Sequence, residues 1–181
     1  MLEDLDIKLR RFQIEDDLHL FHNGHSDSIS MRFYGMNAFT DIEQSRKLLE
    51  RYILSELKQK SIHRVIANSV TNDYMGEIGL YNINDVHNRA DAYCILLPDN
   101  RHKGLSIVAS RLFYKEVFDT TRINRVQAIV DTRNNEAKKS LIGIGFKYEG
   151  TVAQYEYFNN HYIDMDFFAM LKSQFYSLYG K

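Results

Sequence analysis

One segment constrains the fold of this chain more than any other, because it joins three features. An apolar run at residues 93–98 leads into a basic turn at residues 101–106, and a pattern with helical spacing follows. Gly104 allows the backbone a conformation that other residues resist. The first amides of the next helix have no partner within the helix and point into the turn, where the helix dipole is positive. The segment therefore predicts a strand, an anion-binding turn and a helix, with a phosphate or pyrophosphate as the natural ligand.

The charges of the turn favour the same interpretation. Arg101, His102 and Lys103 precede the glycine and add positive potential. The lysine does not stand in the Gly-x4-Gly-Lys-Ser/Thr frame of a P-loop, and the chain has no Gly-x-Gly-x-x-Gly sequence. A basic turn with a single glycine is also common as a purely structural feature. The turn alone therefore does not identify its ligand.

Length and composition exclude several classes of protein. A chain of 181 residues suffices for one domain with a substantial core, so we expect a single domain over residues 1–181. A net charge of −1 does not indicate general nucleic-acid binding. The single cysteine, Cys94, excludes an internal disulfide framework and a cysteine-based zinc site. No apolar stretch reaches a membrane span, and the acidic N-terminal residues do not resemble a signal peptide, so we expect a cytoplasmic protein.

Hydrophobic periodicity predicts alternating strands and helices without a linker. Strand-like patterns predict strands over residues 7–12, 62–70, 74–83, 125–131, 151–158 and 161–171, and the largely apolar run at residues 90–97 predicts a buried strand. Helical spacing predicts helices over residues 15–22, 41–59, from 106 onward and 135–142. Asp41 is the expected N-cap of the second helix, and Val108, Leu112, Phe113 and Val117 form the expected apolar face of the third. This order predicts an α/β (α+β) fold with one mixed sheet flanked by helices.

Further motifs follow the turn in a fixed order. They are Arg101-x-x-Gly104-x-Ser106, then Asn134-x-x-Ala137 with Leu141, then Gly145-Phe146 and Glu149-Gly150. Together they resemble the signature of the GCN5-related N-acetyltransferase (GNAT) superfamily, most closely the RimJ/RimL-like and spermidine acetyltransferase branch. The resemblance extends over nearly the whole chain, and residues 83–91 look particularly like the spermidine enzymes. It implies a single GNAT domain with a mostly antiparallel sheet of about seven strands.

The resemblance also implies a site for acetyl-CoA as co-substrate. The strand backbone at Cys94, Ile95 and Leu96 would pair with the pantetheine arm. The turn amides of Arg101, His102, Lys103, Gly104, Leu105 and Ser106 would hold the pyrophosphate. Asn134 would bond near the pantetheine, while Ala137 and Leu141 would line the thiol end. No metal is implied, and the scattered His25, His87 and His161 are expected to be surface residues.

Acetyl transfer to a primary amine sets its own chemical requirements. An alkyl ammonium with a pKa of about 10.4 must lose a proton before it attacks. Asp91 stands where relatives usually carry a glutamate base; being shorter, it suits a base that acts through water. Its alternative role is that of a polar residue at the mouth of a buried strand. The developing oxyanion needs a donor, which a backbone N–H of residues 94–96 could supply.

Leu141 departs from the family pattern. Many relatives have a tyrosine there that protonates the leaving thiolate, and leucine has no proton to donate. Tyr114, Tyr148 and Tyr155 are the phenols nearby in sequence, and solvent is a further source. A thiol with a pKa of about 8.5 leaves without strong assistance, so turnover need not be lost.

The acceptor is less constrained. Spermidine enzymes carry a carboxylate-rich segment after the first strand and helix, whereas residues 31–39 here contain no acid. Glu77 and Asp85 are expected to be solvated residues at strand ends. Cys94, in an apolar strand, is expected to be inert because burial raises its pKa. Aromatic residues of this region suit a sugar ring, an apolar group or a peptide N-terminus: Phe33, Tyr34, Phe39, Tyr155, Tyr157 and Phe158.

Several functions therefore compete. We favour an acetyl-CoA-dependent N-acetyltransferase that acts on the primary amine of a small molecule such as a polyamine, diamine or amino sugar. A protein N-terminal acetyltransferase, a non-catalytic acyl-CoA-binding module and a nucleotide-phosphate binder unrelated to CoA are the alternatives. We expect neither a nucleic acid nor a membrane as partner. A homodimer or higher homo-oligomer stays open.

Overall fold

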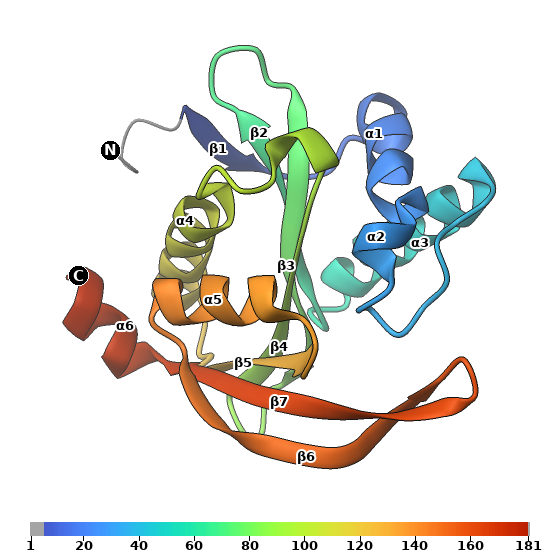
Figure 1. Cartoon of the computed structure of the whole chain (residues 1–181). Helices are drawn as coiled ribbons and strands as arrows, with labels where there is room; N and C mark the ends of the chain where they lie inside the picture. The colour runs from blue at the N-terminus through green and yellow to red at the C-terminus, as the bar shows by residue number, and fades with distance from the viewer. Residues whose placement is uncertain (1–5, 181) are drawn as a thin grey trace.

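The computed structural model describes residues 6–180, so the N-terminal residues considered above as a signal peptide fall largely outside it. One seven-stranded sheet runs through the molecule in the order β1-β2-β3-β4-β5-β7-β6 (Figure 1). This confirms the predicted fold class. The strands are β1 (Ile7–Arg10), β2 (Ile62–Asn68), β3 (Tyr74–Asn84), β4 (Arg89–Leu96), β5 (Arg125–Asp131), β6 (Lys147–Phe158) and β7 (His161–Leu171).

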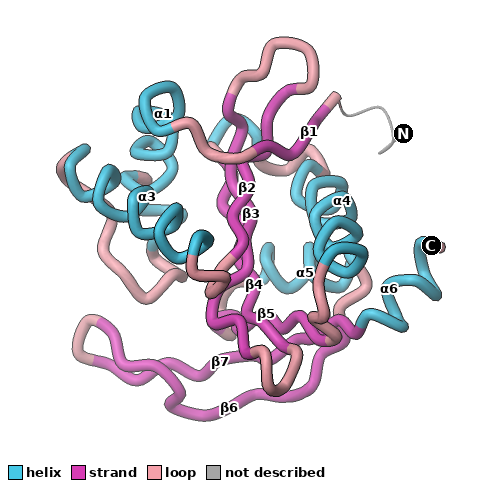
Figure 2. The backbone as a smooth tube through the Cα atoms, turned by 180° about the vertical axis from the view of Figure 1, so that it is seen from behind, coloured by secondary structure: helices cyan, strands magenta, loops and turns pink. Residues whose placement is uncertain are grey.

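Two layers of helices enclose the sheet. Figures 1 and 2 show α1 (Ile14–Ser26), α2 (Ser28–Met31) and α3 (Ile42–Leu57) on one face. The other face carries α4 (Leu105–Thr120), α5 (Asn135–Ile144) and α6 (Lys172–Tyr179). The larger core lies beneath α4 and takes Ile78 and Leu80 of β3, while a smaller core lies beneath α1 and α3. Alternate side chains of each strand therefore point to different layers.

The pairing of β4 with β5 interrupts an otherwise antiparallel sheet. These two strands are parallel and match at only three positions, Arg89 with Arg125, Ala90 with Val126 and Asp91 with Gln127. Beyond these positions, residues 92–96 of β4 do not pair with residues 128–131 of β5. This divergent region is termed the splay. It leaves backbone hydrogen-bonding groups of β4 free for another partner.

Local sequence signals fix the helix boundaries around the splay. Asp41 caps α3 as expected, with Gln44 completing a capping box. Gly104 precedes α4 with φ of 75°, a left-handed conformation that favours glycine. The Asn134 side chain accepts from the Ala137 amide at 3.1 Å and caps α5.

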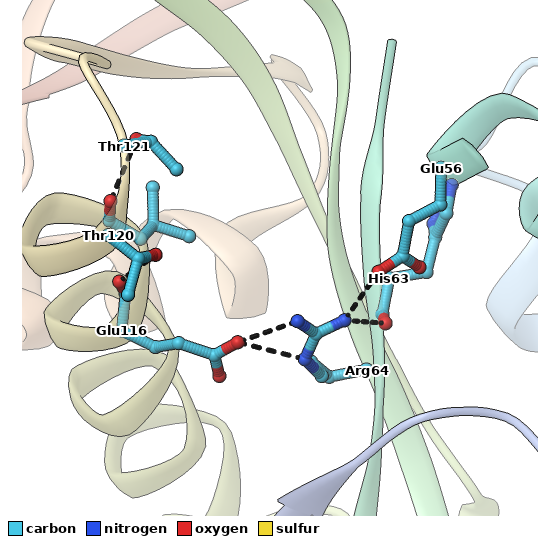
Figure 3. Close-up of polar contacts among 7 residues, drawn as sticks. Glu56, His63, Arg64, Glu116, Thr120 and Thr121 are labelled. Carbon is cyan, nitrogen blue, oxygen red and sulfur yellow. Dashed lines mark hydrogen bonds and ion pairs between the residues drawn. The ribbon is translucent and has the colours of Figure 1, made fainter. Parts of the chain in front are cut away.

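An arginine of β2 links both helical layers to the sheet. Arg64 of β2 donates to Glu116 of α4 at 2.6 and 3.0 Å, and to Glu56 of α3 at 2.9 Å. Figure 3 shows the guanidinium between the two carboxylates, with a further bond to the His63 carbonyl oxygen. The Arg64 side chain is 13% exposed, whereas the side chains of Glu56 and Glu116 are 24% and 36% exposed.

The structure corrects several predicted boundaries. β6 begins at Lys147 rather than residue 151, and α5 continues through Gly143 to Ile144. The helix α6 was not predicted. The apolar face of α4 is also displaced, because Leu112 is 44% exposed whereas Ala109, Phe113 and Val117 are buried. Within residues 6–180, no helix is both long and apolar enough to cross a membrane.

Candidate active site

The end of β4 presents peptide groups to the splay. The Leu97 amide donates to the Met75 carbonyl oxygen of the β3 side at 3.1 Å, and Ile95 is in register with Glu77. Antiparallel strands direct the peptide groups of alternate residues to the same neighbour. Ile95 and Leu97 therefore face β3, whereas Cys94 and Leu96 direct their N–H and C=O groups away from it, into the splay.

Two side chains reach these peptide groups. The Tyr34 hydroxyl donates to the Cys94 carbonyl oxygen at 2.5 Å, and Arg101 Nε donates to the Leu96 carbonyl oxygen at 3.3 Å. Sequence analysis did not connect Tyr34 with Cys94, which stand far apart in the chain. Neither contact uses the N–H groups of Cys94 and Leu96, so these donors remain available.

Apolar side chains of β4 and α5 pack against the same core. Cys94 and Leu96 of β4 pack against the larger core together with Ala137 and Leu141 of α5. Strand and helix residues that the sequence assigned to one site therefore border one core. Burial raises the pKa of the Cys94 thiol to about 12, and a negative charge on Glu77 would add to this effect. The thiol is therefore protonated and inert, as expected.

The turn before α4 places backbone amides at a helix N-terminus. The Ile107 amide donates to the Gly104 carbonyl oxygen at the start of α4. The amides of Leu105 and Ser106 precede this bond and have no acceptor within the helix. The Ser106 hydroxyl lies 2.9 Å from that of Ser140 and connects the turn to α5. His102 and Lys103 are exposed beside the turn. These features suit an anion.

Arg101 has a different role from that of a free cation. Its guanidinium bonds Asp27 at 2.5 Å and also contacts the Ser30 hydroxyl. Burial alone would raise the pKa of Asp27, but the bonds from Arg101 and Ser30 outweigh it and lower that pKa. The side chain thus joins the turn to the start of α2, and its charge is largely balanced there.

Asp91 lies at the point where β4 and β5 begin to diverge. Its carboxylate accepts from Gln127 Nε2 at 2.6 Å and from Asn82 Nδ2 at 2.9 Å, and the residue is 7% exposed. Its neighbours Ala90 and Ala92 face the larger core, so Asp91 faces the opposite layer. The carboxylate is thus fixed by two amides, on the side of the sheet opposite α5.

A family comparison accounts for this geometry. The model of the acetyltransferase (GNAT) domain matches residues 6–147, most of the chain. The chain belongs to the GNAT acetyltransferase family. It is accordingly an acyltransferase by family, as the sequence motifs implied.

Individual GNAT relatives agree with this placement. An uncharacterized N-acetyltransferase, YoaA of Bacillus subtilis, is 26% identical over 95% of this chain and 97% of its own length. The spermidine N-acetyltransferase of Vibrio cholerae, solved with CoA and spermine, has a TM-score of 0.82 at 20% identity, over 94% of this chain and 98% of that one. A ribosomal L7/L12 acetyltransferase, RimL, solved with CoA, has a TM-score of 0.81 at 17% identity, over 92% and 94%. Acetyl-CoA as co-substrate is consistent with these structures.

The opposite layer of this GNAT domain holds a buried acid that sequence analysis misplaced. Glu77 is fully buried rather than solvated, and neither of its carboxyl oxygens has a hydrogen-bond partner among the described residues. His25, expected at the surface, is 1% exposed, and its Nε2 lies 3.3 Å from Glu77 Oε1. Both were misplaced because α1 covers this part of β3, a contact that the local sequence does not reveal.

The β6–β7 hairpin brings another acid to the same side. Its tip extends beyond the sheet toward the α1–α3 layer (Figure 1), and the Glu156 carboxylate lies so close to Gly35 that an added Cβ would be 3.1 Å from Oε2. Burial, and secondarily the charge of Asp131, raise the pKa of Glu156. Among residues 6–180, no lysine or arginine pairs with Glu156. A half-buried carboxylate without a cation favours a cationic ligand.

Proposed function

We propose that the protein transfers the acetyl group of acetyl-CoA to the primary amine of a small molecule. The observation that carries this proposal is the pair of peptide groups at Cys94 and Leu96, which face the splay beside the N-terminus of α4. Free strand amides suit the amide-containing pantetheine arm, and a helix N-terminus suits the pyrophosphate. CoA contains both groups, so these residues fit it.

The chain's own groups meet the needs of acyl transfer. When bound, acetyl-CoA supplies an activated acyl carbon. The N–H groups of Cys94 and Leu96 provide donors for negative charge on the acyl oxygen. Asp91 takes the proton of the attacking amine through a water molecule, because the carboxylate is buried and the aspartate side chain is too short for direct contact.

The acceptor we propose is a small cationic amine. Glu156 supports this class, because its charge acts on Tyr81, whose ring suits the methylene groups of a diamine or polyamine. Amino sugars are a second member of the class, since aromatic faces also suit sugar rings. The relatives include a spermidine acetyltransferase, which agrees with the proposal.

Two measurements test the function. Calorimetry gives the affinity for acetyl-CoA, and a thiol reagent follows CoA release with polyamines, diamines, amino sugars and a peptide with a free N-terminus. We expect binding of acetyl-CoA and turnover with at least one small amine. Turnover of the peptide alone would instead favour a protein N-terminal acetyltransferase. Binding without turnover would favour the non-catalytic module, and stronger binding of ATP or GTP would contradict CoA recognition.

Cellular location and assembly stay predictions. The cytoplasm is the expectation from sequence, and a homodimer or higher homo-oligomer stays open. Sedimentation of the purified protein would establish the oligomeric state.

A further inference from the structure

The Tyr34 hydroxyl enters the splay from the layer opposite α5. Tyr34 follows α2, and its hydroxyl donates to the Cys94 carbonyl oxygen at 2.5 Å. Tyr34 is 38% exposed, so a ligand in the splay can reach it. A carbonyl oxygen has two lone pairs, so this contact leaves one position on Cys94 for a ligand. The phenol is thus held where β4 would meet the thiol end of CoA.

Cleavage of a thioester places negative charge on sulfur, and few groups near Cys94 can stabilise it. Ala137 and Leu141 of α5 border the same core as Cys94, and their side chains have no polar hydrogen. The three phenols nearby in sequence are otherwise placed. Tyr114 is near enough for the charge of Cys94 to act on it, but it is only 3% exposed in the core and closed to a ligand. The Tyr148 hydroxyl bonds Thr151, and Tyr155 packs edge-on against Phe167 on the hairpin.

We propose that Tyr34 is a catalytic residue whose hydroxyl donates a hydrogen bond to the departing sulfur of CoA. This inference rests on the proposed function. It assigns to the segment after α2 the part that Leu141 cannot perform on α5. Tyr34 thereby gains a role beyond anchoring its loop to β4.

The step balances as follows. The amine nitrogen forms a bond to the acyl carbon, the carbon–sulfur bond breaks, and its electron pair passes to sulfur. Tyr34 turns its O–H toward the sulfur and stabilises the thiolate without losing its proton. The proton of the amine leaves through water to Asp91, and the thiolate takes its proton from solvent after release. No further reactant is needed.

The surroundings keep the phenol in its donor form. Enclosure by protein raises the pKa of Tyr34 far above the usual value, and charges on Cys94, Glu77 and Tyr81 would raise it further. Arg101 is the cation that acts in the opposite direction. Tyr34 therefore stays protonated around neutral pH, where it can donate a hydrogen bond.

Titration of the CoA thiol on the protein tests the inference without knowledge of the acceptor. The thiolate absorbs in the ultraviolet, and Cys94 does not interfere because its pKa is about 12. With Tyr34→Phe, we expect the pKa of bound CoA to rise by about one unit, since a hydrogen bond to the thiolate is lost. Tyr179→Phe is the matched control, because its hydroxyl also bonds a backbone carbonyl oxygen, that of Ile144 at 2.6 Å.

Kinetics add a second readout. Tyr34→Phe should lower kcat about ten- to hundredfold and leave the affinity for acetyl-CoA within about twofold, whereas Tyr179→Phe should retain both. If Tyr34→Phe does not fold, fluorotyrosine at position 34 keeps the ring, strengthens the donor and should lower the thiol pKa instead. An unchanged thiol pKa in a folded variant that binds CoA would overturn the role of Tyr34 alone. Failure of the unaltered protein to bind CoA would overturn the proposed function together with this inference.

Discussion

Burial beneath α1 sets the protonation states of Glu77 and His25. His25 Nδ1 lies 3.0 Å from the Phe21 carbonyl oxygen, which can only accept, so Nδ1 carries the ring hydrogen. Burial lowers the pKa of His25 to about 4, so the ring is neutral and Nε2 is unprotonated. Burial also raises the pKa of Glu77 well above its usual range. The pair is therefore a carboxylic acid facing a neutral imidazole.

This state predicts a pH-dependent effect of Glu77→Gln on stability. Above about pH 4.5, the unfolded chain has released the Glu77 proton while the folded protein retains it. The free energy of unfolding then falls by about 1.4 kcal/mol per pH unit until the folded group titrates. Glutamine removes this loss, so urea unfolding should show a stability gain for the variant that grows from pH 5 to pH 8.

The control for Glu77→Gln is Glu43→Gln, at an exposed position of α3. Burial also lowers the pKa of His63 to about 4, so His25 and His63 reduce stability as the pH falls from 6.5 toward 4. Both histidines are present in all three proteins, so they largely cancel in the comparison. A gain independent of pH would contradict the protonated state of Glu77.

Asp91→Asn tests the base at the start of the splay. Turnover should fall about tenfold or more, most strongly at low pH, where the amine is protonated and needs a base. Affinity for acetyl-CoA should stay nearly unchanged. The measurement is the pH profile of kcat/KM for the amine. A profile with the same shape as that of the unaltered protein would remove Asp91 from the mechanism.

At the scale of elements, the N-terminus of α4 is the proposed pyrophosphate site. Gly104→Glu introduces a side chain at φ of 75° and a negative charge beside the leading amides. We expect calorimetry to show acetyl-CoA affinity reduced about tenfold or more. Gly180→Glu is the matched control, since Gly180 also has φ of 75° but follows α6. Equal affinity in both variants would contradict the site.

The β6–β7 hairpin carries the proposed contact to the acceptor. Glu156→Gln removes the negative charge against Gly35 but keeps the shape of the side chain. The KM for a diamine should rise about tenfold, while acetyl-CoA affinity stays the same. Glu50→Gln, exposed on α3, is the control. An unchanged KM for every amine that turns over would exclude Glu156 from acceptor binding.

Strong local signals predicted most elements, and the misses have physical causes. Asp41 marked the start of α3 because its capping bonds are local. The bounds of β5 were predicted in full because the alternation of its side chains is also a local pattern. The helix α6 was missed because Lys172 follows β7 without a glycine or proline between them. Tyr34 and Glu77 could not be placed, because their partners come from elements distant in sequence.

At the scale of the whole molecule, Arg64 connects the two layers that enclose the sheet. Arg64→Met keeps an apolar stem but leaves Glu56 and Glu116 without their shared cation. We expect the free energy of unfolding to fall by about 1–3 kcal/mol, with acetyl-CoA affinity unchanged. Arg46→Met should cost less than about 1 kcal/mol, because its contacts to Glu15 and Glu43 are long and exposed. Equal losses in the free energy of unfolding for Arg64→Met and Arg46→Met would show that the Arg64 ion pairs stabilise the protein no more than exposed ones.

The order of the strands has a consequence for how the chain folds. β7 lies between β5 and β6, although it is the last strand in the sequence. During synthesis, which starts from the N-terminus, β5 therefore exposes one unpaired edge until residues 161–171 have emerged. Such an edge can pair with a neighbouring chain. Aggregation of nascent protein should thus depend on how quickly β7 pairs with β5. The strands β1–β4 should contribute least to aggregation, because they pair in the order in which they are made.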